Sequence, residues 1–166
     1  MGTGTIIIVT ILFLAIAIPV FNTNRKNKKK EKLLLDRMNE FAEKSNCKIS
    51  NYQHWKDLQI GIDQDAGKLF FIRNTQAHES ASEVDLSQVQ HARVLKGERI
   101  INTAGDKYVT VDKIDLNFTF RTTRPEMVLN FYDCNYDSPV VQGELQVAEK
   151  WKEISNSWIS EKNKKS

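Results

Sequence analysis

The stretch Ile114–Phe120, which reads IDLNFTF, decides the fold because apolar and polar side chains alternate along its whole length. Successive side chains of a β-strand point to opposite faces of the sheet, so one face of this segment is apolar. Its members are Ile114, Leu116, Phe118 and Phe120. A clean alternation of this kind is typical of an antiparallel strand with one buried face. The segment therefore predicts an antiparallel sheet.

Strand signals continue on both sides of this segment. Met127, Leu129 and Phe131 alternate after a turn that contains Pro125. Upstream, the two apolar runs 58–62 and 68–73 flank a turn that ends in Gly67, which predicts a hairpin. Further strand material is expected at residues 84–86, 89–101 and 108–111. The count is six or seven antiparallel strands.

The periodicity changes after Gly143, where apolar residues recur every three or four positions. This spacing predicts one amphipathic helix of about four turns. An antiparallel sheet of this size tends to curl, and the helix is suited to cover its open end. We expect the core of this capping helix to consist of Leu145, Ala148, Trp151, Ile154 and Trp158.

The order of six or seven strands, the Gly61–Ile72 hairpin and the closing helix with its tryptophans resembles the pleckstrin-homology-like superfold. The resemblance covers residues 48–160 and implies an α+β domain built as a sheet or partly open barrel with one C-terminal capping helix. A lipocalin-like fold or another small barrel with a helix is the alternative. The superfold includes phosphoinositide binders, phosphopeptide binders and members that bind only proteins. Lys56 and Lys68 face three acidic residues near the first hairpin, so the basic cradle of the lipid binders is missing.

The N-terminal segment Thr5–Phe21 reads TIIIVTILFLAIAIPVF and carries no charge. With its uncharged flanks it is long enough for a bilayer core of about 30 Å, which predicts an uncleaved transmembrane anchor. The basic residues lie after the apolar run, in a membrane-proximal cluster formed by Arg25, Lys26, Lys28, Lys29, Lys30 and Lys32. The positive-inside rule then predicts a single-pass protein of the cell (inner) membrane, with its N-terminus outside and its C-terminal domain in the cytoplasm.

Residues 31–46 join the anchor to the domain and predict a connector helix, with an apolar stripe that includes Leu34, Met38 and Phe41. Docking of this stripe on the domain is the favoured interpretation, and homodimerisation through residues 31–46 is the alternative. The expected parts are an anchor (1–24), the basic run with the connector helix (25–47), the domain (48–160) and a polar tail (161–166). With this anchor the chain is similar to small uncharacterised membrane-anchored bacterial proteins that carry a pleckstrin-homology-like domain.

The charge distribution and the spacing of potential ligand residues argue against several classes of function. The chain has a net charge of +3, but residues 48–160 carry 13 basic and 16 acidic side chains, a net −3, which argues against a nucleic-acid partner. His54, His78 and His91 lack metal-ligand spacing, and Asp63 with Asp65 does not make a calcium loop. Cys47 and Cys134 are expected as free thiols, and Cys134 has no activating neighbour in sequence. We therefore expect no catalytic site, cofactor or metal.

The resulting hypothesis is a membrane-tethered, cytoplasmic binding or scaffolding module. Its partner would be a membrane or cytoplasmic protein, held at a strand edge or beside the terminal helix. The bilayer itself is expected to contact residues 5–21. Two alternatives stay open, namely a module that responds to anionic lipid through the basic cluster, and an enzyme whose site is not recognisable from its residues.

Overall fold

The computed structural model describes residues 29–75, 79–103 and 106–165. The elements are a helix over residues 29–43, β1 (Asn51–Trp55), β2 (Leu58–Asp63), β3 (Lys68–Asn74), β4 (Glu79–Asp85), the 3₁₀ helix η1 (Leu86–Gln88), β5 (Val89–Thr103), β6 (Asp106–Phe120), β7 (Met127–Asp133) and α2 (Glu144–Lys165). The chain divides into two compact units, residues 1–37 and 38–166, and each is described by itself.

In the first unit, the described residues 29–37 are helical and mostly exposed. They include Lys29, Lys30 and Lys32, all of them solvent-exposed, and Leu33, which is 69% exposed. The connector helix expected over residues 31–46 is thus observed over residues 29–43.

The first sheet of the second unit has the strand order β1-β2-β3-β4 and is antiparallel throughout. The predicted hairpin forms from β2 and β3, with Leu58 opposite Arg73 and Asp63 opposite Lys68. Gly67 closes its turn at a φ of 68°, a conformation that glycine adopts without a steric penalty. Both faces of the sheet are covered, because alternate residues of β3 pack on opposite sides.

On one face of this sheet, Phe70 and Ile72 of β3 pack with Met38 and Ala42 from the end of the N-terminal helix. On the other face, Ile60 and Phe71 belong to the larger core that the second sheet and α2 also enter. The docking of the connector stripe on the domain is therefore observed for residues 38–42. Homodimerisation through residues 31–46 stays a prediction.

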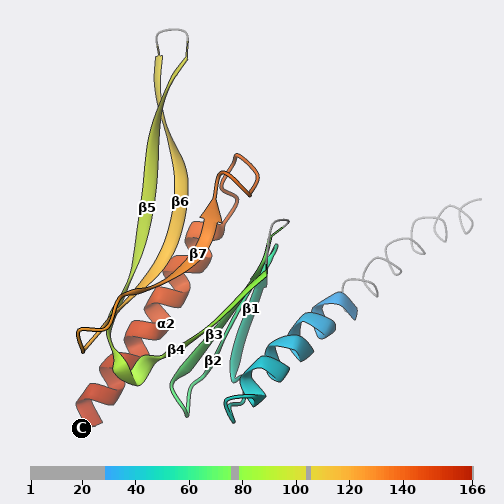
Figure 1. Ribbon diagram of the computed structural model, residues 1–166, viewed down its shortest axis with the longest axis vertical. Helices are drawn as coiled ribbons and strands as arrows, with labels where there is room; N and C mark the ends of the chain where they lie inside the picture. The colour runs from blue at the N-terminus through green and yellow to red at the C-terminus, as the bar shows by residue number, and fades with distance from the viewer. Residues whose placement is uncertain (1–28, 76–78, 104–105, 166) are drawn as a thin grey trace, which may run out of the picture. The chain divides into compact units, whose positions relative to one another are not determined.

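The second sheet has the order β5-β6-β7. Its strands β5 and β6 are 15 residues each, whereas β7 has only 7 and pairs with β6 from Lys113 to Phe118. The tip of the β5–β6 hairpin therefore extends beyond the other elements (Figure 1), while at the base of its outer part Val111 packs against the core and the Asp112 carbonyl accepts a hydrogen bond from the Cys134 N–H. The alternation of Ile114–Phe120 is borne out, since Ile114, Leu116, Phe118 and Phe120 are all buried in the core.

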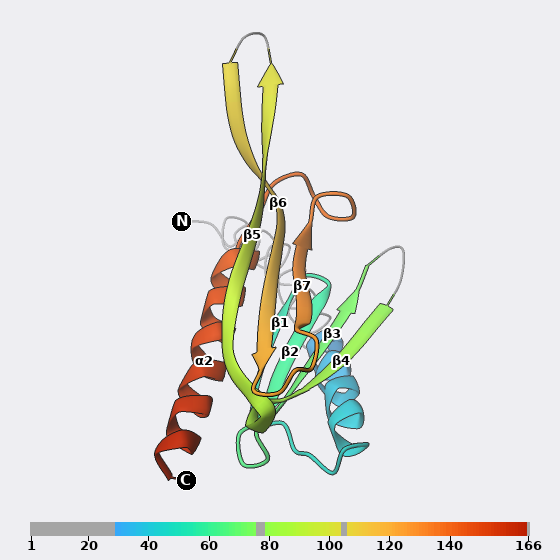
Figure 2. The ribbon, with the colours of Figure 1, turned by 60° about the vertical axis from the view of Figure 1, so that its left-hand side comes forward.

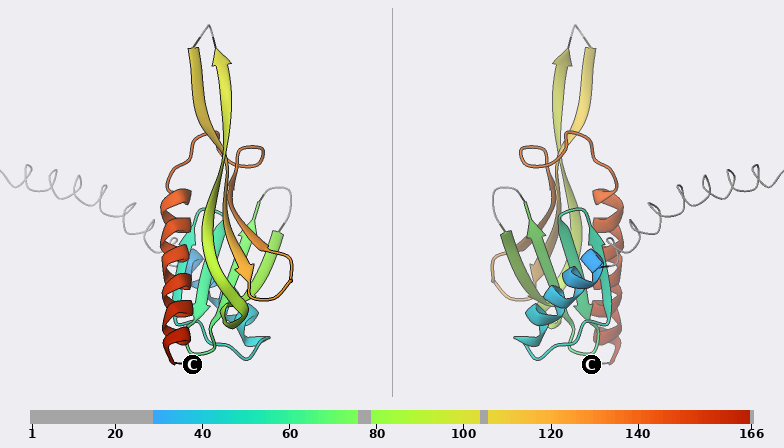
Figure 3. Two further views of the ribbon diagram at one scale, coloured as in Figure 1. Left: turned by 90° about the vertical axis from the view of Figure 1, so that its left-hand side faces the viewer. Right: turned by 90° about the vertical axis from the view of Figure 1, so that its right-hand side faces the viewer.

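Helix α2 lies along the second sheet (Figure 3). Of its predicted core residues, Ala148 and Trp151 are fully buried, while Leu145, Ile154 and Trp158 are partly buried against the same core. Val147 and Ile159 are more deeply buried than these three. The helix continues to Lys165, through most of the stretch that was expected to be a polar tail.

The predicted fold class needs correction. The strands do not form one sheet or a partly open barrel, but two antiparallel sheets of 4 and 3 strands. The physical reason lies at Leu86–Gln88, where the chain leaves β4 in a 3₁₀ turn capped by Asp85 and starts a new sheet at Val89. β1 and the continuity of β6 were also missed, because β1 (NYQHW) has little apolar alternation. The resemblance to the pleckstrin-homology-like superfold stays a prediction.

The prediction of a single-pass membrane protein is also corrected. Among the residues that the structure describes, no helix has the length and apolar character needed to cross a membrane. The helix of residues 29–43 is shorter than the about 20 residues that a bilayer requires, and α2 carries charged side chains along its length. The segment Thr5–Phe21 on which the prediction rested lies outside the described residues, as do Arg25, Lys26 and Lys28.

Candidate functional site

The two sheets each end in a strand, β4 and β7, whose outer edge is paired with no other strand among the described residues. On β4, the orientation of the backbone follows from the hydrogen bond that the Leu86 N–H donates to the Gly67 carbonyl, at 2.8 Å. Backbone groups alternate sides along a strand, so Val84 and Ser82 also bond to β3. The N–H and C=O groups of Ala81 and Glu83 therefore face away from the sheet.

The edge of β7 is oriented by a second hydrogen bond. The Asn130 carbonyl accepts a hydrogen bond of 3.1 Å from the Arg73 guanidinium rather than from β6. The same alternation then turns the backbone groups of Val128 outward, while Leu129 bonds to Leu116 of β6. Val128 is also 49% exposed. The outer edges of β4 and β7 thus each carry backbone groups that do not bond within their own sheet.

A groove of about 310 Å³ is lined by residues of both sheets. Residues of β3 and β4 line it from the first sheet, and residues of β6, β7 and the turn after β7 line it from the second. Figure 2 shows β4 and β7 as outer strands of the two sheets. Its lining mixes an apolar floor with hydroxyl and amide groups. The lining residues are Phe71, Arg73, Thr75, Ser80, Ser82, Lys113, Val128, Leu129, Asn130, Asp133 and Tyr136.

Three charged residues line this groove, and of these Arg73 is buried, with only 4% of it exposed, whereas Lys113 is exposed and Asp133 is half-buried. The Arg73 guanidinium contacts the carboxylates of Asp57 at 3.4 Å and Asp137 at 2.5 Å. The Asp137 carboxylate also accepts a hydrogen bond of 2.6 Å from the Asp133 backbone N–H. A buried charge is tolerated when it is paired and hydrogen-bonded in this way. Arg73 therefore ties β3 to β7 across the groove and leaves no excess positive charge there.

The outer edge of β5 differs from those of β4 and β7. The Asn156 side chain on α2 accepts a hydrogen bond of 2.8 Å from the Ala92 N–H and donates one of 2.9 Å to the Ala92 carbonyl. Its amide thus takes the place of a neighbouring strand residue. Strand addition is blocked at this position, beside the terminal helix.

A second groove, of about 690 Å³, lies between α2 and the β2–β3 turn. Charges of both signs line it, from Asp65, Glu153 and Glu161 and from Lys150 and Lys162. It offers neither strand edges nor a patch of one sign. We therefore place the candidate site in the groove between β4 and β7.

The acidic and cysteine residues considered as candidates for metal binding or catalysis make contacts that stabilise the fold. The Asp63 carboxylate accepts hydrogen bonds from the backbone N–H groups of Lys48, Asp65 and Ala66, and these lower its pKa although burial alone would raise it. Burial, and after it the neighbouring Asp112, raises the pKa of the Cys134 thiol, which disfavours the reactive thiolate. Cys47 and Cys134 are both free thiols.

The histidines and the acidic residues also give no metal centre. His54 contacts the Lys56 carbonyl, His91 is exposed, and His78 lies outside the described residues. Within residues 29–75, 79–103 and 106–165 there is no group of three or more His, Cys, Asp or Glu side chains that could hold a metal ion.

The groove residues were not predicted from sequence. Arg73 had a recognisable signal, because it falls in the alternating series Leu69, Phe71, Arg73 and is thus a charge on the core face of a strand. Asn156 had none, since a polar residue on a helix is ordinarily solvent-exposed. Val128 and Asn130 were recognised as strand residues, but their status as an outer edge depends on the sheet order.

None of the family models, curated proteins or solved structures with which the chain was compared matches it.

Proposed function

We propose that the chain is a protein-binding module that holds an extended segment of its partner in the groove between β4 and β7. The observation that carries the proposal is the pair of strand edges with outward-facing backbone groups, at Ala81 and Glu83 on β4 and at Val128 on β7. The N–H of Asn130 extends the β7 edge, while its carbonyl is already bonded to Arg73. Added strands gain affinity from backbone hydrogen bonds, and side-chain pockets give them specificity. A segment seated between two edges can bond on both of its sides.

The lining of the groove defines the preferred segment. Side chains of an extended peptide alternate in direction, so every second one would point toward Phe71 and Leu129, which are buried. Apolar side chains suit that side. Because Arg73 is already paired with two carboxylates and Lys113 with Asp115, an acidic side chain would gain little there. The partner is thus an uncharged, extended segment with apolar residues at alternate positions.

The test is a selection from a library of random peptides displayed on phage, with the full-length chain as bait, followed by affinity measurement of synthetic peptides by fluorescence anisotropy. Ser82→Tyr places a large side chain in the groove, because Ser82 lines it. Ser157→Tyr is the matched control, since Ser157 is an exposed serine on α2 that does not line the groove.

We expect the selected peptides to bind the wild type and the Ser157→Tyr variant alike. Binding to the Ser82→Tyr variant should be at least about tenfold weaker, which corresponds to about 1.4 kcal/mol. Peptides that bind both variants equally well, or a selection that enriches no common pattern, would refute the proposed groove.

A further inference from the structure

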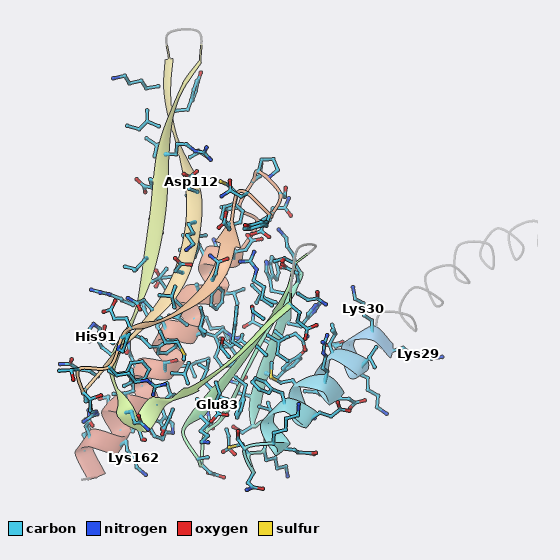
Figure 4. The ribbon with its side chains drawn as sticks, viewed as in Figure 1. Lys29, Lys30, Glu83, His91, Asp112 and Lys162 are labelled. Carbon is cyan, nitrogen blue, oxygen red and sulfur yellow. The ribbon has the colours of Figure 1, made fainter. Side chains whose placement is uncertain are left out.

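The outer part of the β5–β6 hairpin, here called the arm, comprises residues 96–103 and 106–112. It begins where β7 ends, since Lys113 is the last residue of β6 on this side that pairs with β7, opposite Asp133. Asp112 marks its base (Figure 4). The arm exposes large apolar side chains, with Ile100 62%, Tyr108 56% and Val109 66% accessible.

The arm has a free strand edge along β6. Because Ala92 of β5 bonds outward to Asn156, alternation assigns Arg99 to the set of β5 residues that bond to β6. Its register partner is Thr110, so the backbone groups of Lys107, Val109 and Val111 face away from β5. No strand of the described chain pairs with this edge.

Such an edge is unusual in a protein that stands alone. A two-stranded ribbon is marginally stable in water without further strands or a covering element. Natural sheet edges are commonly protected by charges, prolines or bulges. Here the segment from Tyr108 to Val111 carries no charge and no proline. The irregularity between Gly97 and Glu98 leaves Asp112 of β6 without a partner on β5, at the base of the arm and directly after this segment.

We propose that this edge pairs with the same edge of a second copy of the chain, in an antiparallel, two-fold symmetric dimer. When two copies of this edge pair, residues whose backbone groups face outward must lie opposite residues of the partner whose backbone groups also face outward. A two-fold axis beside Val109 does so, with Val109 opposite the partner's Val109 and Lys107 opposite the partner's Val111. Tyr108 then lies opposite the partner's Thr110, a pair of an aromatic with a β-branched side chain, which is favourable across strands.

Over the five paired residues 107–111, apolar rows and charges both match in this register. Ile100 of β5 lies opposite Val109 of β6 in the same chain. One face of the joined four-stranded sheet therefore gains a row of four apolar side chains, namely Ile100 and Val109 of both copies. Glu98 pairs with Val111 in the chain, which puts the partner's Lys107 two strands away on the same face, at ~10 Å between backbones. Long side chains span that distance, so two Glu98–Lys107 attractions form per dimer. This complementarity selects a second copy as the occupant.

The interface is small. Five paired residues per copy bury less than the ~800 Å² per partner of a standard stable interface. The dimer is therefore weak and concentration-dependent. It uses neither β4 nor β7, so it is independent of the proposed peptide groove.

Because Val109 lies opposite its own copy, charge substitutions there give a specific test by analytical ultracentrifugation of the full-length chain. Val109→Glu alone and Val109→Lys alone each place like charges at the axis, and each should weaken dimerisation by at least about tenfold. An equimolar mixture of the two variants should restore it. Val140→Glu, at a valine that is 61% exposed and lies in the loop after β7, is the control and should dimerise like the wild type.

Circular dichroism and the thermal midpoint check that the variants fold, which is expected because Val109 is largely exposed. A wild type that stays monomeric up to high micromolar concentration would overturn the proposal. So would the finding that this edge of β6 binds other proteins but not a second copy of the chain. Single variants that dimerise like the wild type, or a mixture that does not recover, would overturn it as well.

Discussion

Replacement of Arg73 by methionine should destabilise the protein more than any single surface substitution. The change removes the guanidinium that contacts Asp57, Asp137 and the Asn130 carbonyl, while it keeps most of the side-chain volume. Breaking a fully buried ion pair by removal of one partner costs about 3–5 kcal/mol. The cost here is smaller, because the Asp57 side chain is 30% exposed and Asp137 keeps its bond to the Asp133 N–H.

We therefore expect a loss of about 2–4 kcal/mol in the free energy of unfolding. For a chain of this size the thermal midpoint should fall by about 5–15 °C. Urea denaturation followed by tryptophan fluorescence measures the first quantity, and circular dichroism measures the second. Removal of the stranded carboxylate by Asp137→Asn in the Arg73→Met background should recover part of the loss, since the two residues are in direct contact.

Arg93→Met provides the matched control. Arg93 pairs with Glu126 at 3.0 Å, but the two side chains are 50% and 42% exposed. Exposed pairs contribute about 0–1 kcal/mol, so this variant should lose little stability. Equal losses for Arg73→Met and Arg93→Met, or no recovery in the double variant, would refute the view that Arg73 ties the two sheets together.

Three further predictions concern the rest of the domain. Gly67→Ala should lower the free energy of unfolding, measured by urea denaturation, by at least about 2 kcal/mol, because φ is positive and the new Cβ would lie 2.0 Å from Trp158 Cζ2. Gly97→Ala is the control and should cost less, since the nearest contact of its new Cβ is at 3.3 Å. Asn156→Ala should cost about 1–3 kcal/mol by the same assay, because it leaves the backbone groups of the buried Ala92 unpaired, and Ser157→Ala is the exposed control. Burial alone would raise the pKa of Asp63, but three backbone hydrogen bonds lower it below its ordinary value of 3.8. The ionised Asp63 therefore stabilises the folded protein above that pH, and this contribution is lost as pH falls through the folded-state pKa. The difference in unfolding free energy between the wild type and Asp63→Asn should shrink below about pH 4, and a difference that stays constant with pH would contradict this.

The sequence predicts those elements whose signal is local. The alternation of Ile114–Phe120, the Gly67 turn and the period of α2 each describe a single segment, and each is observed. The division into two sheets depends on which strands pair across long separations, and no local pattern encodes it. The β4 and β7 edges follow from that pairing, so the candidate groove could not be predicted. Arg73 is the exception, since a charge in a core-facing position signals a buried partner.

Hydrogen exchange of single backbone amides, read by NMR on the full-length chain, tests the peptide groove most directly. In the free protein, the N–H groups of Ala81, Glu83, Val128 and Asn130 should exchange faster than those of Ser82 and Leu129, which bond within the sheets. Saturation with a selected peptide should slow exchange at these four outward amides and leave the arm residues Val109 and Val111 unchanged. Slow exchange of the four amides in the free protein, or no change when the peptide is bound, would contradict strand addition between β4 and β7.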